Sequence, residues 1–180
     1  MEIRGPLIAP FGGRVPVVPP SVFVAPTAVV VGDVVLGEST SVWYGAVVRG
    51  DVGPIRVGAR TNIQDHCVLH VTTGLPGLTV GDEVTVGHRA ILHGATIRDR
   101  CLVGMGAILL DGCEIGEESL IGAGSVVREG TVIPPRSFAA GIPAVVKGPI
   151  PPALHARLRA SADAYVLLAR EHAGLRHDAR

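Results

Sequence analysis

The chain has 180 residues, of which 16 are basic and 16 are acidic, so its formal net charge is zero. This length suits one domain with a sizeable core, and the balanced charge gives no indication of a nucleic-acid partner. No apolar run approaches the roughly 20 residues of a membrane-spanning helix, and the opening MEIRGPLIAP lacks the apolar segment of a signal peptide. We therefore expect a cytoplasmic protein with neither a membrane nor a nucleic-acid partner.

The composition predicts many short strands around an aliphatic core. Hydrophobic residues make up 47% of the chain but aromatic residues only 3%, and 24 glycines and 14 prolines provide frequent turns. Residues 1–29 contain six of these prolines and no cluster of side chains that suggests chemistry. We expect this segment to be an extended lead-in that caps the first coil of the fold.

The next segment contains a repeat of six residues. An aliphatic residue returns every six positions, often followed by glycine, and a small or modest side chain stands four positions after it. The phase is kept across two longer steps, from residue 48 to 57 and from 69 to 80, and one shorter step from 92 to 97. The repeated aliphatic positions are Leu36, Val42, Val48, Val57, Ile63, Leu69, Val80, Val86, Leu92, Ile97, Val103, Leu109, Ile115, Ile121, Val127 and Ile133.

A six-residue unit with one large and one small inward-facing residue is typical of a parallel β-helix. Each unit forms a short strand and a turn, and three units close one coil. We name the three faces a, b and c in the order of Leu36, Val42 and Val48. Successive coils stack at the inter-strand spacing of about 4.8 Å, so the aliphatic residues form a continuous core. The sequence therefore predicts an all-β fold, a parallel β-helix over about residues 30–138.

The three cysteines, Cys67, Cys101 and Cys113, all occupy the small inward position of the repeat. A buried free cysteine behaves as a small apolar side chain. Their spacing is not that of a zinc site, so we expect three packing residues without a disulfide.

After Gly141 the repeat ends, and a helix is predicted from about Pro152 to His172. Its apolar residues recur every three to four positions, so we expect one buried stripe and a helix that folds back along the β-helix. The chain is thus divided into residues 1–150, the β-helix with its lead-in, and residues 151–180, the helix and a frayed tail. The expected stripe is Leu154, Leu158, Ala162, Tyr165 and Leu168, and the expected solvated histidines are His155, His172 and His177.

Counting along the repeat places two other histidines on one face. His70 and His93 each follow an aliphatic position of face c by one, so they lie one coil apart, about 4.8 Å. His70 and His93 are further apart in sequence than the three six-residue units that make one coil. The extra residues predict a protruding loop over residues 71–79. His88 belongs to face b and is poorly placed to join them within one chain. In a cyclic trimer, a neighbouring copy would bring its face b against this face c and supply the third nitrogen.

We call the contact between face c of one copy and the His88 side of the next the seam. Three imidazoles at this seam predict a metal site. Three neutral histidines leave the fourth tetrahedral position open, which is the arrangement of catalytic zinc, although Fe(II) or Co(II) also accept these ligands. Such a metal provides hydroxide that can attack a small electrophilic carbon.

Four more polar residues lie near this seam. Arg49 stands in the column of His70, with Asp51 just past it. Asp65 and Gln64 stand on face b. One interpretation is that the three charged residues only form ion pairs between subunits, and the other is that they also orient the site.

The runs RGDVGPIRVG, TNIQDHCVLHV, VGHRAILHG and VGMGAILLDG resemble those of the γ-class carbonic anhydrases, over about residues 20–146. The resemblance implies a left-handed β-helix that forms a homotrimer. It also implies reversible hydration of carbon dioxide to bicarbonate by a zinc-bound hydroxide at the interface between subunits.

The resemblance assigns roles to the residues above. His70 and His93 of one subunit and His88 of the next would bind zinc. An interface cluster of ion pairs would consist of Arg49, Asp51 and Asp65. Gln64 would hydrogen-bond the hydroxide and orient it toward carbon dioxide.

Several positions depart from the family pattern. Val52 stands where highly active members have a glutamate, residues 71–79 carry no acid that could shuttle protons, and Ala139 replaces a tyrosine. His66 is the remaining candidate base, and it also fits a plain surface residue. Whether hydratase activity is substantial, low or absent is therefore left open by the sequence. Two other functions stay open: an acyl-CoA transferase or thioesterase, and a catalytically silent metal-binding scaffold.

Overall fold

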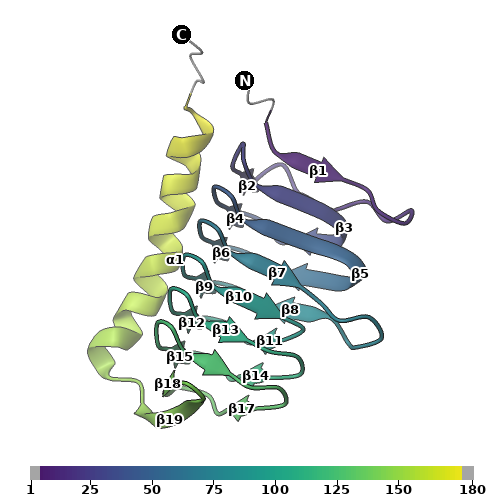
Figure 1. The fold of residues 1–180 in the computed structure, drawn as a ribbon. Coiled ribbons are helices and arrows are strands. Elements are labelled where there is room, and N and C mark those ends of the chain that lie inside the picture. The colour runs from purple at the N-terminus through teal and green to yellow at the C-terminus, as the bar shows by residue number, and fades with distance from the viewer. Residues whose placement is uncertain (1–4, 176–180) are drawn as a thin grey trace.

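The structure, a computed structural model, describes residues 5–175. Figure 1 shows a three-sided stack of short strands, with one helix running along its side. The strands form two parallel ladders, and the antiparallel pair β18 and β19 ends the stack. Parallel β-strands and one helix confirm the predicted fold class.

The strands divide into an 11-stranded and an 8-stranded sheet. The first sheet contains β1 (Leu7–Ala9), β3 (Val29–Leu36), β5 (Val47–Val57), β7 (Val68–His70), β8 (Leu78–Val80), β10 (Ile91–His93), β11 (Thr96–Ile97), β13 (Ile108–Leu109), β14 (Glu114–Ile115), β16 (Val126–Val127) and β17 (Val132–Ile133). The second sheet contains β2 (Phe23–Val24), β4 (Ser41–Val42), β6 (Asn62–Ile63), β9 (Thr85–Val86), β12 (Leu102–Val103), β15 (Leu120–Ile121), β18 (Ser137–Gly141) and β19 (Ala144–Pro149).

The two sheets correspond to the three predicted faces. Strand β5 continues around one corner, so its first part pairs with β7 on face c and its last part pairs with β8 on face a. The 8-stranded sheet is face b. In each ladder the aliphatic positions of the repeat stand in register, as in the pairs Val48 with Leu69 and Ile63 with Val86. The period of six therefore fixes both the strand positions and their pairing.

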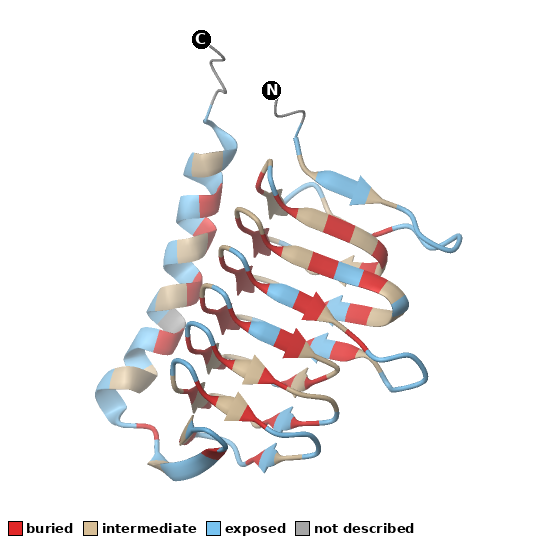
Figure 2. Ribbon diagram, in the orientation of Figure 1, coloured by how far each residue is buried: buried red, intermediate tan, exposed pale blue. Residues whose placement is uncertain are grey.

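The core contains the residues that the repeat predicts. All of the repeated aliphatic positions are buried, and so are the three cysteines (Figure 2). Burial raises the pKa of Cys67, Cys101 and Cys113 to about 12. The thiols are free and act as apolar packing groups, as predicted.

The coil begins earlier in the chain than the sequence predicted. Val24 in β2 pairs with Val42, and β1 pairs with the start of β3. Residues 23–24 therefore already form part of face b. Val24 and Val30 keep the six-residue spacing that leads to Leu36, so the repeat itself extends back to this strand.

Helix α1 (Pro152–Ala173) packs on face b, against β2, β4, β6 and β9 (Figure 1). Proline at its start fits the first helical turn, where the missing N–H has no partner to lose. Its buried residues are Leu158, Ala162, Val166 and Ala169. Within the described residues, no helix combines the length and apolar character that crossing a bilayer requires.

Part of the predicted helix stripe was wrong. Leu168 is 39% exposed, whereas Val166 and Ala169 are buried in its place. Each helical residue turns the side chain by about 100°, so Leu168 falls to one side of the face that Ala169 occupies. The spacing of apolar residues alone could not decide whether the buried stripe continues through Leu168 or through Val166 and Ala169.

The prediction for the histidines of this segment was also wrong. His155 Nε2 lies 3.0 Å from Glu118 Oε2, and His172 Nδ1 lies 3.0 Å from the hydroxyl of Tyr44. Both contact the β-helix and are only partly exposed, so they join the helix to it as well as meeting solvent. His177 lies outside the described residues.

Candidate metal centre

His70 and His93 lie side by side on face c. They end β7 and β10, which pair in register so that each histidine is the direct neighbour of the other. The ring atoms His70 Nδ1 and His93 Nε2 are 3.2 Å apart. The side chains are 18% and 29% exposed, so both rings are partly shielded yet reach the surface. The predicted placement of the two histidines in one column, one coil apart, is confirmed. Their role as metal ligands stays a prediction.

The loop that follows His70 leaves the stack, as predicted, before β8 resumes it (Figure 1). Gly74 and Gly77 have positive φ angles of 81° and 105° in this loop. A side chain at Gly77 would place its Cβ 2.5 Å from the carbonyl oxygen of Pro54. Glycine is therefore required where the loop rejoins face a.

A carboxylate stands at the outer end of each imidazole. Asp51 Oδ1 lies 3.0 Å from His70 Nε2, and Asp111 Oδ2 lies 3.2 Å from His93 Nδ1. An ionised carboxylate only accepts hydrogen bonds, so the nitrogen that faces it carries the proton. In neutral imidazoles, the inner nitrogens of both rings then direct lone pairs toward each other. A metal ion between the two rings, or a third proton shared by them, makes such an arrangement favourable.

These distances suit a metal ion. Two nitrogens bound to a tetrahedral zinc at about 2.05 Å are about 3.3 Å apart. The separation of 3.2 Å between the inner nitrogens is close to that value. Within residues 5–175, no three His, Cys, Asp or Glu side chains of one chain come together in metal-binding geometry. A single chain thus offers two imidazoles to an ion at this position.

His88 lies on another face of the stack. It follows β9 in the 8-stranded sheet, whereas His70 and His93 belong to the 11-stranded sheet. Its Nδ1 lies 2.9 Å from Asp65 Oδ2, and its side chain is 43% exposed. The structure therefore orients His88 through Asp65 and directs it outward, but it does not bring His88 to the other two within the chain.

Gln64 lies against His88 and not against His70. Its Oε1 accepts a hydrogen bond of 3.1 Å from the backbone N–H of His88, and its Nε2 donates to Asn62 Oδ1 at 3.0 Å. Asn62 in turn donates to Thr85 Oγ1 at 3.0 Å. The amide of Gln64 is buried and held at both ends, so its orientation is fixed.

Arg49 and Asp51 form an ion pair beside His70. Burial raises the pKa of Asp51, but hydrogen bonds from Arg49 and His70 lower it by more, so the net pKa lies below its ordinary value. Asp51 therefore stays ionised at neutral pH. Asp65 is on face b, so one chain does not assemble the three residues into one cluster.

The sequence analysis missed Asp111, although the repeat contained an indication of it. Asp111 stands two residues after Leu109, an aliphatic position of face c. It is therefore on the same face as His93, one coil further on. The loop after His70 carries no acidic side chain, and the acid near the site comes instead from this next coil of face c.

Comparison with known proteins agrees with the repeat. The family model "Bacterial transferase hexapeptide (six repeats)" matches residues 94–129. A solved structure of a hexapeptide transferase family protein from Anaplasma phagocytophilum is 37% identical, with a TM-score of 0.88, and the match covers 92% of this chain and 97% of that one.

Several curated relatives are named as carbonic anhydrases, and two of them illustrate the similarity. The chain is 55% identical over 123 residues to the "Probable carbonic anhydrase" of Methanocaldococcus jannaschii, which covers 68% of this chain and 77% of the relative. It is 54% identical over 102 residues to "Gamma carbonic anhydrase 2, mitochondrial" of Arabidopsis thaliana. That match covers 54% of this chain and only 37% of the plant protein. The repeat, the histidine pair and these identities together place the chain in the γ-class carbonic anhydrase family.

Proposed function

We propose that this protein catalyses the reversible hydration of carbon dioxide to bicarbonate at metal sites shared between the subunits of a homotrimer. His70 and His93 of one subunit and His88 of the next are the ligands. The observation that carries the proposal is the pair of imidazoles whose inner nitrogens face each other at 3.2 Å while carboxylates hold their outer nitrogens. Zinc is the metal that we expect, with Fe(II) or Co(II) as alternatives.

An exposed apolar column supports the assembly. Val47, Val68, Ile91, Ile108 and Val126 stand in register on the outer side of face c. Val68 and Ile91 are 38% and 36% exposed and belong to the same strands as the two histidines. A continuous aliphatic ladder on an open face favours contact with another protein surface. A second copy that packs against this column with the turn after its β9, which carries His88 and is not part of the strands under α1, also brings its His88 to the seam.

The ion supplies one part of the chemistry, since three-histidine zinc lowers the pKa of coordinated water, as is known for carbonic anhydrases. The chain supplies the positioning. Asp51 and Asp111 hold the two imidazoles, and Asp65 holds His88. Gln64 presents a fixed amide beside His88, from which we expect it to orient the attacking oxygen. Arg49 and Asp51 on face c, with Asp65 from the turn after β6 of the neighbouring subunit, form the charged rim between subunits.

We expect turnover to be limited by proton transfer. Val52 is an exposed apolar residue just past Asp51, and the loop between β7 and β8 has no acidic side chain. His66 is exposed on the turn before Cys67. Proton transfer to buffer requires a base close to the reacting oxygen. The rate should therefore rise with the concentration of an external buffer base.

The proposal is tested by metal analysis, native mass and stopped-flow hydration on zinc-loaded protein. We expect a trimer with about one zinc per chain and a hydration rate above that of buffer. His93→Ala should lose metal and activity, whereas His155→Ala, a histidine on the helix, should keep both. A monomer, or zinc-loaded protein without any rate above buffer, would contradict the proposal. A trimer whose metal is retained without activity would support the silent metal-binding scaffold instead.

Acyl transfer or thioester hydrolysis is the second candidate, because the 37% identical Anaplasma protein is named a hexapeptide transferase family protein. Saturation binding of acetyl-CoA measured by calorimetry would favour it. Failure to bind acetyl-CoA at millimolar concentration would remove it.

A further inference from the structure

Asp111 occupies an unusual position for an acidic side chain. Its Oδ2 lies 3.2 Å from His93 Nδ1 and accepts a hydrogen bond of 2.9 Å from Thr72 Oγ1. Its Oδ1 is buried and has no hydrogen-bond partner among the described residues. A buried carboxylate oxygen without a partner costs free energy. The hydrogen bonds of Asp111 itself therefore do not explain why a carboxylate occupies this position.

Gly94 makes this position available. It directly follows His93 and has a φ of +57°. A Cβ built on Gly94 would lie 1.9 Å from Asp111 Oδ1. The carboxylate can thus reach back to His93 only because residue 94 has no side chain.

We propose that Asp111 is a positioning residue that fixes the tautomer of His93, so that Nδ1 carries the proton and Nε2 presents its lone pair to the metal seam. Thr72, from the loop after His70, holds the carboxylate in place through its hydroxyl. A carboxylate behind a metal-binding histidine also orients the ring and makes the ligand more basic. The loop between β7 and β8 is thereby linked to the site through Thr72 and Asp111. This inference rests on the proposed function, because it concerns the same seam.

The test uses the full-length protein and two readouts. The first is the tautomer of His93 in metal-free protein, measured from the ¹⁵N shifts of its ring. The second is zinc affinity, measured by competition with a chelator. In Asp111→Asn, the amide can either accept from Nδ1–H or donate to Nδ1, so we expect His93 to lose its preference for the tautomer with the proton on Nδ1. Zinc affinity should fall by about 10- to 100-fold, the usual loss for such partners. Thr72→Val should weaken affinity in the same direction but by less.

Asp99→Asn is the matched control. Asp99 is also an acidic residue two positions after an inward aliphatic residue, and a Cβ on Gly81 would lie 2.3 Å from its Oδ1. It accepts a hydrogen bond from the backbone of Asp82, and the amide of asparagine can accept the same bond. The control should leave the tautomer and the zinc affinity unchanged.

The outcomes separate the two proposals. An unchanged His93 tautomer in Asp111→Asn, with zinc affinity equal to that of the Asp99→Asn control, would overturn the positioning role while leaving the proposed function intact. Wild-type protein that binds no zinc would contradict the proposed function, and the tautomer measurement would still decide the role of Asp111. Should Asp111→Asn fail to fold, Thr72→Val provides both readouts.

Discussion

Gly94 is the residue on which the placement of Asp111 depends. Its φ of +57° costs an alanine about 1–2 kcal/mol, and the added Cβ would collide with Asp111 Oδ1. Because a side-chain oxygen can move aside, we expect Gly94→Ala to fold, to lose about 1–2 kcal/mol of unfolding free energy, and to displace the carboxylate from His93. Chemical denaturation and zinc competition measure the two effects.

Gly112→Ala separates strain from collision. Gly112 has a similar φ of +69°, but the atom nearest to its added Cβ is 3.9 Å away. We expect the same loss of unfolding free energy as in Gly94→Ala and no change in zinc affinity. Equal zinc affinities in the two variants would show that the contact between Gly94 and Asp111 has no effect on the site.

At the scale of single residues, the sequence predicted which residues share a column of the stack, but not which side chains touch. Counting in sixes put His70 beside His93, because the strand register follows directly from the period. It could not show that Asp51, rather than Arg49, contacts His70, because that depends on side-chain rotamers. It also missed Asp111, whose contact with His93 depends on a glycine one coil below it.

At the scale of elements, α1 is held to face b by a short apolar stripe. Leu158 is 3% exposed at this contact, whereas Leu167 on the same helix is 58% exposed. We expect Leu158→Ala to lower the free energy of unfolding by about 2–5 kcal/mol, because it leaves a cavity under the helix. Leu167→Ala should change it by less than about 0.5 kcal/mol. Equal effects, measured by urea denaturation, would show that the helix does not pack as described.

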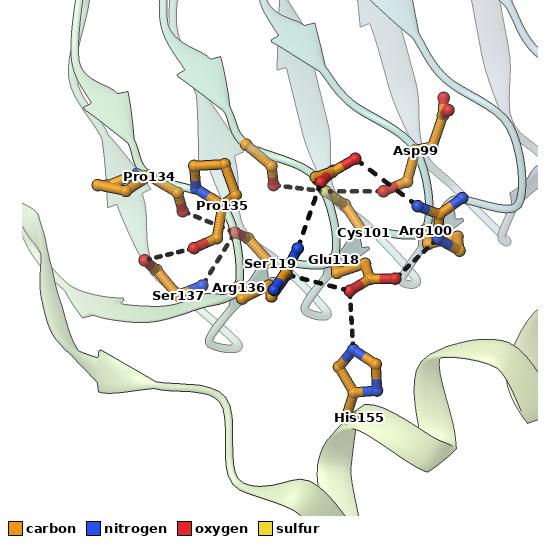
Figure 3. A network of polar contacts seen from close by, with 12 residues as sticks. Asp99, Arg100, Cys101, Glu118, Ser119, Pro134, Pro135, Arg136, Ser137 and His155 are labelled. Carbon is orange, nitrogen blue, oxygen red and sulfur yellow. Dashed lines mark hydrogen bonds and ion pairs between the residues drawn. The ribbon is translucent and has the colours of Figure 1, made fainter.

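A polar network fixes the first turns of the same helix (Figure 3). Glu118 accepts a hydrogen bond from Arg100, forms an ion pair with Arg136, and lies 3.0 Å from His155 Nε2 of α1. The hydrogen bond with His155 and that with Arg100 lower the pKa of Glu118 below its ordinary value of 4.5. Below that pH the unfolded chain binds the proton more readily than the folded one. Glu118 therefore stabilises the fold above pH 4.5, and this contribution is lost as the pH falls through the lower folded pKa.

Glu118→Gln should remove this part of the acid sensitivity. We expect the variant to be less stable than wild type at pH 7, and the difference to shrink as the pH falls below 4.5. Denaturant titrations from pH 7 to about pH 3 measure it. Glu129→Gln is the control, since Glu129 forms no ion pair in the part of the chain that the structure describes. A constant difference across the range would contradict the lowered pKa.

The helix illustrates what sequence reasoning could not supply. Its existence and its start were predicted, because proline fits the first turn and the apolar spacing was regular. Its binding face was only partly predicted, because Leu168 and Ala169 fit the period almost equally well. The contacts of His155 and His172 join segments that are distant in sequence, and no local pattern carries that information.

For the molecule as a whole, the proposed site requires two different faces of two different copies. His70 and His93 are on face c, and His88 is on face b. A defect on one face of a subunit should therefore leave its other face able to complete a seam with a neighbour. This property distinguishes a shared site from three ligands gathered within a single chain.

Mixed trimers test this property directly. Pure His88→Ala and pure His93→Ala trimers should each lack metal, because every seam misses one ligand. When the two variants are refolded together in equal amounts, random assembly gives about one quarter of the seams an intact face c from the first and an intact face b from the second. We expect zinc content and hydration rate to recover to about that fraction of wild type. A mixture of His70→Ala and His93→Ala should recover nothing, since both defects lie on face c. Equal recovery in both mixtures, or none in the first, would rule out ligands shared between subunits.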